Sequence, residues 1–168
     1  IKHFYFTLEH PDRKAIRDII IYDNNLSGPI PESITSLSNL RFVDLSRNDL
    51  NGSIPENIGN LTNLEVIGLS SNNLSGSIPE SLTTIKSVRE IWLNINKLTG
   101  HIPEGVQQLP NLEKLYLNDN QLSGGIPDSF YNWNFWKSWW GNTLLNNNFK
   151  FEIPNSSIIP LTIPTTVL

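Results

Sequence analysis

The chain contains no cysteine, which excludes disulfide caps and thiolate metal sites. Histidine is scarce as well. His3, His10 and His101 lie far apart, and no nucleophile or metal-ligand spacing surrounds them. No glycine-rich phosphate loop is present. These absences argue against an enzyme, and we expect no catalytic site, no cofactor and no metal.

Charge and long apolar runs are also limited. The formal net charge is −4 at pH 7, and the lysines and arginines are scattered. This pattern argues against nucleic acid or an anionic membrane as the main partner. No apolar run approaches ~18 residues, so we expect no membrane span in this chain. Hydrophobic residues make up 38% of the chain, which is low for a globule but sufficient for stacked repeats.

The chain has instead a repeating unit. Units that start at Leu40, Leu64 and Val88 read LRFVDLSRNDLNGSIPENIGNLTN, LEVIGLSSNNLSGSIPESLTTIKS and VREIWLNINKLTGHIPEGVQQLPN. A fixed period of this length predicts a solenoid. The expected parts are an N-terminal cap strand over 1–15, five repeats over 16–138, a degenerate sixth repeat over 139–154, and an extended tail or cap over 155–168. We expect residues 3–8 to lie beside the first repeat strand and cover its apolar end.

The residue types within a unit predict its path. Apolar residues at the fourth and sixth places alternate as in a short strand with one buried face. The glycine at the thirteenth place permits backbone conformations that other residues avoid. Proline at the sixteenth place suits the first position of a short helix. Asparagine at the ninth place is expected to point inward and bind backbone groups where the chain turns. These asparagines are Asn24, Asn48, Asn72, Asn96, Asn120 and Asn147.

These units resemble the plant-type leucine-rich repeat, whose pattern is LxxLxLxxNxLSGxIPxxLGxLxx. The match covers residues 16–154. The resemblance implies an α/β repeat fold: a right-handed solenoid with a parallel sheet on its concave face and short 3-10 or α segments on its convex face. It also implies a secreted or cell-surface protein whose concave face binds proteins, peptides or glycans. The plant members usually carry paired cysteine caps, so this chain looks closer to the cysteine-free versions in bacterial surface proteins.

Period-two alternation predicts that side chains at the third, fifth, seventh and eighth places of each unit face outward. The fifth-place column is Ile20, Asp44, Gly68, Trp92, Tyr116 and Thr143. Trp92 and Tyr116 are expected to be neighbours, ~4.8 Å apart between strands. Ile20, Tyr22 and Phe42 form a second apolar group, separated from the first by small residues. Aromatic anchors flanked by charge are typical of protein-binding surfaces. The predicted binding residues are Ile20, Tyr22, Phe42, Asp44, Trp92, Ile95, Lys114 and Tyr116.

The predicted function is therefore non-catalytic recognition of a protein or peptide. One alternative is recognition of a glycan or glycosidase, as by the polygalacturonase inhibitors that the resemblance includes. Another is a structural spacer in a multidomain surface protein, in which exposed aromatics reflect only strand propensity. Ice binding would need a uniform Ser or Thr column, and only Ser27, Asn51, Ser75, Thr99 and Ser123 come near. The aromatic residues over 130–140 are interpreted as a plug that seals the last full coil.

Overall fold

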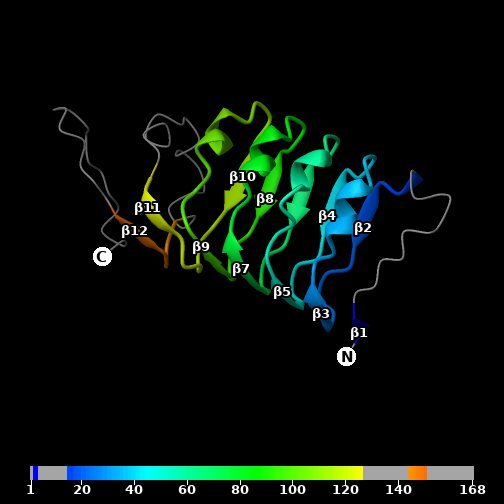
Figure 1. Ribbon diagram of the computed structural model, residues 1–168, viewed down its shortest axis with the longest axis horizontal. Helices are drawn as coiled ribbons and strands as arrows, with labels where there is room; N and C mark the ends of the chain where they lie inside the picture. Colours follow the sequence, from blue (N-terminus) through cyan, green and yellow to red (C-terminus); the bar gives the residue numbers. More distant parts are fainter. Residues whose placement is uncertain (1, 4–14, 127–143, 151–168) are drawn as a thin grey trace.

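The computed structural model describes residues 2–3, 15–126 and 144–150, and these form a stack of coils. The coils follow one another along the long axis in sequence order (Figure 1). The first four repeats each contribute a strand to one sheet, a strand to a second sheet and a short 3-10 helix. The solenoid predicted from the repeat is therefore confirmed, and its coils contact their sequence neighbours as a nearest-neighbour array requires.

The first sheet is parallel, and its strands are in the order β10-β8-β6-β4-β2. Its register pairs residues 24 apart, so that Ile20, Asp44, Gly68, Trp92 and Tyr116 form one row across the strands. This row is the fifth-place column expected from the sequence. The strands are β2 (Asp18–Ile20), β4 (Phe42–Asp44), β6 (Val66–Gly68), β8 (Glu90–Trp92) and β10 (Lys114–Tyr116).

A second parallel sheet, which the sequence analysis did not anticipate, follows the asparagine turn of each coil. Residues in these strands alternate between exposed and buried, as Asn73, Leu74 and Ser75 do. The strands are β1 (Lys2–His3), β3 (Leu26–Pro29), β5 (Asp49–Gly52), β7 (Asn73–Ser77) and β9 (Lys97–Thr99), and β11 (Ser123–Gly125) pairs separately with β12 (Asn148–Lys150).

The expected cap strand over residues 3–8 lies outside the described residues except for His3, because the structure describes only residues 2–3 of this segment. β1 pairs with β3 in the second sheet, with Lys2 opposite Leu26, and not with the first repeat strand β2. The reason is positional, because residues 2–3 precede residues 26–27 by one full period. They therefore supply the second-sheet strand of an incomplete preceding coil, where they pair with the backbone groups along that edge of β3.

In sequence, each short helix follows a strand of the second sheet and precedes the next strand of the first sheet. They are η2 (Glu32–Ser36), η3 (Ile58–Asn60), η4 (Glu80–Thr84) and η5 (Glu104–Gln108). Pro31, Pro79 and Pro103 are N-cap residues with extended ψ, not the first helical residues that the sequence predicted. In the second coil the helix starts later, after Asn57, so the acidic residue Glu56 lies before it.

The core is a column of aliphatic side chains that runs through the stack. The first, fourth, sixth and eleventh places of the central coil are all buried: Leu64, Ile67, Leu69 and Leu74 are at most 2% exposed. Leu144 and Phe149 of the last described segment pack against this core. The apolar places assigned from the sequence therefore hold the coils together through burial against neighbouring coils.

The inward asparagines form a hydrogen-bonded ladder between coils. The Oδ1 atom of Asn72 accepts the N–H of Leu50 in the preceding coil at 3.0 Å. Its Nδ2 group donates to the carbonyls of Leu45 and Leu69. Asn48, Asn96, Asn120 and Asn147 repeat this pattern. Asn24 differs, because it is exposed and its Nδ2 group donates to the carbonyl of Tyr22 within its own coil.

Two backbone columns adopt positive φ. One is the thirteenth-place glycine column, with φ between 75° and 94°, as predicted. The other is at the eighth place, where Arg47, Ser71 and Ile95 have φ near 55°. The first-sheet strand has ended before this place, so strict alternation no longer applies. For the same reason Ser46, at the seventh place, is buried although it was expected to face outward.

Among the described residues, no helix has the length and apolar character needed to cross a membrane. The expected aromatic plug over 130–140, the start of the sixth repeat and the tail over 155–168 lie outside the described residues. The later part of the sixth repeat is described, and there Asn147 continues the ladder after a spacing of 27 residues instead of 24.

Candidate binding surface

Trp92 and Tyr116 lie side by side on the outer face of the first sheet. The register pairs them directly, and both are half-buried. The Nε1 group of Trp92 donates a hydrogen bond to Oε2 of Glu90 at 3.1 Å. Because Glu90 is two residues earlier on the same strand, this bond fixes one edge of the indole above the sheet. The aromatic pair is therefore held in place before any ligand arrives.

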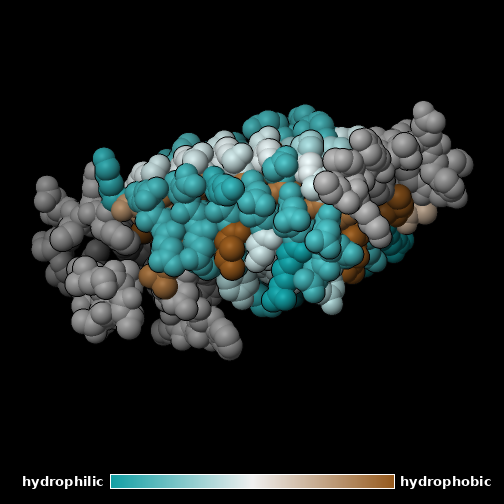
Figure 2. Space-filling view, turned by 90° about the horizontal axis from the view of Figure 1, so that it is seen from below, coloured by the Kyte–Doolittle hydropathy of each residue, from teal (hydrophilic) through white to brown (hydrophobic). Residues whose placement is uncertain are grey.

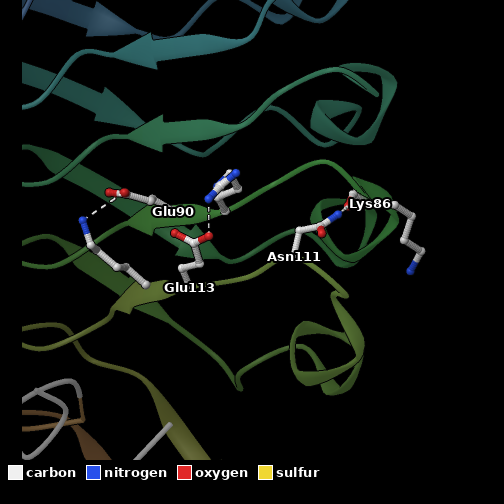
Figure 3. Close-up of polar contacts among 6 residues, drawn as sticks. Lys86, Glu90, Asn111 and Glu113 are labelled. Carbon is white, nitrogen blue, oxygen red and sulfur yellow. Dashed lines mark hydrogen bonds and ion pairs between the residues drawn. The ribbon is translucent and has the colours of Figure 1, made fainter. Parts of the chain in front are cut away.

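Lys114 completes this group. Its Nζ atom lies 2.9 Å from Oε1 of Glu90 on the neighbouring strand. The hydrogen bond that Lys114 donates to Glu90 raises the pKa of Lys114 above its ordinary value. Figure 3 shows Glu90 on β8 with Glu113 beside it. Glu113 forms an ion pair with Arg89. Glu90 thus neutralises Lys114 and positions Trp92 at once.

The Cε3 edge of the indole lies over Gly68, a residue without a side chain. Gly68 lies between Asp44 and Trp92 in the fifth-place row and is buried. A Cβ placed on Gly68 would be 2.7 Å from Oδ1 of Asp44 and 3.1 Å from Cε3 of Trp92. The two side chains therefore converge above this glycine from both sides. The sequence marked Gly68 only as a small residue between two apolar groups.

The second apolar group occupies the first two coils. Ile20 and Tyr22 are 60% and 56% exposed, which is unusual for large hydrophobic side chains. Phe42 is half-buried, and the guanidinium carbon of Arg41 lies 5.7 Å from its ring centroid. Arg41 also forms an ion pair with Glu65 at 2.7 Å. Most of the predicted residues thus form two clusters on one sheet, with strand β6, which carries Gly68, between them.

Ile95 is placed differently from the other candidates. It lies beyond the end of β8, it is 49% exposed, and its φ is 56°. A β-branched residue rarely adopts this conformation, because its side chain crowds the backbone. Sequence reasoning placed Ile95 on the surface correctly but missed its strained backbone.

Two polar arrays along the stack also escaped the sequence analysis. Second-place charges pair between coils, as Arg41 does with Glu65 and Arg89 with Glu113. Last-place amides bind the preceding coil, as Asn111 does to the carbonyl of Lys86 at 2.8 Å (Figure 3). The ion pairs could have been predicted from the alternating charge of the second-place residues, which are Arg41, Glu65, Arg89 and Glu113.

Figure 2 shows the molecule from below the view of Figure 1, where the strands β3, β5, β7 and β9 are labelled. This surface is mainly hydrophilic and carries scattered hydrophobic side chains. In the second sheet the register pairs Ser27 with Asp49 and Ser75 with Lys97. The candidate Ser and Thr column is therefore interrupted by charged cross-strand partners and does not form the uniform array that ice binding would need.

The described part of the chain holds no cluster of three or more His, Asp or Glu side chains that could bind a metal ion. His101 pairs with Glu80 at 3.2 Å, and both side chains are about two-thirds exposed. Exposed pairs of this kind contribute little to stability. What the described surface offers is contact area: aromatic rings, aliphatic side chains and fixed charges on one sheet.

Comparisons with known proteins identify the repeat. Family models described as leucine-rich repeats match residues 15–37, 39–61 and 62–122. A chain in the BIR3–SERK2 complex from Arabidopsis thaliana is 36% identical with a TM-score of 0.72, covering 80% of this chain and 69% of that one. The Arabidopsis thaliana BIR2 ectodomain is 34% identical with a TM-score of 0.72, covering 82% and 70%. A comparison with curated proteins gave no match.

A larger structure is also similar. It is the Arabidopsis receptor kinase HAESA in complex with the peptide hormone IDA and the co-receptor SERK1, at 32% identity and a TM-score of 0.76. The alignment covers 85% of this chain but only 23% of that chain. The resemblance to cysteine-free bacterial versions stays an expectation. From the repeat pattern, the stacked coils and these matches, the chain belongs to the leucine-rich repeat family, and its repeats are of the plant type.

Proposed function

We propose that this chain is a non-catalytic module that binds a peptide or an extended protein segment across the outer face of the first sheet, the expected concave face. The observation that carries the proposal is the pairing of Trp92 with Tyr116. The indole of Trp92 is held along one edge by its hydrogen bond to Glu90. Large aromatic side chains held in one orientation lose little entropy on binding, which is why they dominate binding energies.

The structural relatives support a peptide or protein as the ligand. One of them is a receptor kinase crystallised with a peptide hormone and a co-receptor, and another is part of a complex between two proteins. We infer by this similarity that the module works outside the cytoplasm, on the cell surface or after secretion. An extended ligand also suits the site, since the two apolar clusters lie on one sheet and are separated by strand β6, which carries Gly68.

The test is a mutation at the centre of the surface. Peptides are selected from a displayed random library against the wild-type chain, and their affinities are measured by calorimetry. Trp92→Ala should weaken binding by about tenfold or more, the usual loss for a central aromatic anchor. The melting temperature should change little, because the ring is half-exposed. Lys97→Ala, at an exposed residue of the second sheet, is the matched control and should bind as the wild type does.

The same experiment separates the alternatives. A glycan-binding role would give retention on an oligosaccharide array and no selected peptides. A spacer role would give neither, and substitutions along the first sheet would have no effect on any interaction. Selected peptides whose affinity is unchanged by Trp92→Ala would move the binding site away from this sheet.

A further inference from the structure

The row of Asp44, Gly68 and Trp92 is more specific than an aromatic surface alone. These residues are neighbours on β4, β6 and β8. Gly68 has no side chain, and the carboxylate of Asp44 and the Cε3 edge of Trp92 occupy the space that a Cβ would take. An anionic oxygen and an indole therefore converge over one buried backbone position.

Both groups are held in place. The indole is fixed along its opposite edge by the bond from Nε1 to Glu90. Oδ1 of Asp44 accepts the backbone N–H of Ser46 at 3.0 Å. Among the described residues, no hydrogen bond to Oδ2 of Asp44 is present, and Asp44 forms no ion pair. The site thus presents a free carboxylate oxygen beside an aromatic ring.

The neighbouring charges leave Asp44 as the available anion. Glu90 is bound by Lys114, and Arg41 is bound by Glu65. A planar cation can contact an indole and a carboxylate at once, through cation–π attraction and a charge-assisted hydrogen bond. Guanidinium suits this arrangement better than ammonium because it is planar and more weakly hydrated.

We propose that Asp44 and Trp92, which together cover Gly68, form a subsite for a cationic side chain of the bound peptide, with arginine preferred over lysine. This subsite rests on the proposed function, because it lies within the same surface. It adds a statement about ligand chemistry that the aromatic pair alone does not give: the peptide carries a positive charge at the position that lies over Gly68.

The test begins with the selected peptides, which should share an arginine or lysine at one position. Replacing that arginine with citrulline keeps the shape and removes the charge, and it should weaken binding by about tenfold, in the range of one desolvated charge contact. Asp44→Asn should cause a similar loss with the arginine peptide and almost none with the citrulline peptide. That non-additivity assigns the charge to Asp44.

Gly68→Ala tests whether the positions of Asp44 and Trp92 over Gly68 matter for binding, without removing any functional group. The added Cβ would displace the Asp44 carboxylate and the indole edge, so binding of the arginine peptide should fall by about tenfold as the cation loses both contacts. Gly125→Ala is the matched control, since a Cβ there meets nothing within 4 Å. Circular dichroism and thermal melting of both variants show whether the fold is kept; if Gly68→Ala unfolds, the Asp44→Asn and citrulline cycle decides.

The outcomes separate the two proposals. Peptides that require Trp92 but share no cationic residue, or that bind Asp44→Asn as tightly as the wild type, overturn the subsite and leave the proposed function standing. Neutral oligosaccharides retained through Trp92 and indifferent to Asp44→Asn also overturn it. A library that yields no binder sensitive to Trp92→Ala contradicts both proposals together.

Discussion

At the scale of single residues, the inward asparagines stabilise the fold by pairing buried backbone groups of two neighbouring coils. A buried amide that bonds to three or four backbone groups cannot be removed without leaving some of them unpaired. Asn72 is 9% exposed and bridges two coils in the middle of the stack. Asn24 occupies the equivalent place in the first coil but is exposed. The asparagine side chain should therefore contribute more to the free energy of unfolding at Asn72 than at Asn24.

This difference gives a direct prediction. Asn72→Ala should lower the free energy of unfolding by roughly 1–3 kcal/mol, because it strands the N–H of Leu50 and several carbonyls. Asn24→Ala should cost much less, since water can reach its partner. Urea denaturation of the two variants against the wild type measures both values. Equal losses would mean that the ladder does not depend on burial.

The sequence predicted the inward asparagines and the fifth-place row because both follow from period and alternation. It did not predict the positive φ at Ile95 or the convergence of Asp44 and Trp92 over Gly68. The first depends on where the strand stops, and the second depends on side-chain rotamers. Neither property is encoded by a period.

At the scale of elements, the 3-10 segments stack through small residues. Gly59 in η3 lies against η4, and a Cβ there would be 2.5 Å from the carbonyl oxygen of Ser81 and from Oγ1 of Thr84. A backbone oxygen cannot rotate away as a side chain can. The spacing of the coils on this side is therefore limited by glycine at this place.

Gly59→Ala should destabilise the fold by about 1–3 kcal/mol, the cost of overpacking a close contact. Gly125→Ala is the comparison, because a Cβ there would meet nothing within 4 Å. The Gly125 variant should lose much less. Chemical denaturation compares the two, and an equal or larger loss at Gly125 would contradict the proposed role of the Ser81 carbonyl.

The second sheet shows where element prediction from the sequence was incomplete. Its strands alternate as first-sheet strands do, with Leu74 buried between exposed neighbours. Those residues were read only as an asparagine turn followed by a glycine, so the strand between them was missed. The pairing of β1 with β3 was missed for the same reason, because it requires this second sheet.

At the scale of the whole molecule, the stack places the fifth-place side chains of successive coils in one row across the first sheet. Each coil contacts its neighbours only, so its buried places maintain stability while its outward places are free to differ. This freedom explains why Ile20, Gly68 and Trp92 can occupy equivalent places in coils of the same backbone. Recognition is therefore a property of the row, not of any one repeat.

The most direct measurement is a crystal structure of the chain with a peptide selected from the random library. The account predicts that the peptide lies across β4, β6, β8 and β10, with an aliphatic or aromatic side chain on Trp92 and Tyr116 and a cationic side chain above Gly68. A peptide bound to the second sheet or along the 3-10 segments, with the outer face of the first sheet empty, would contradict it.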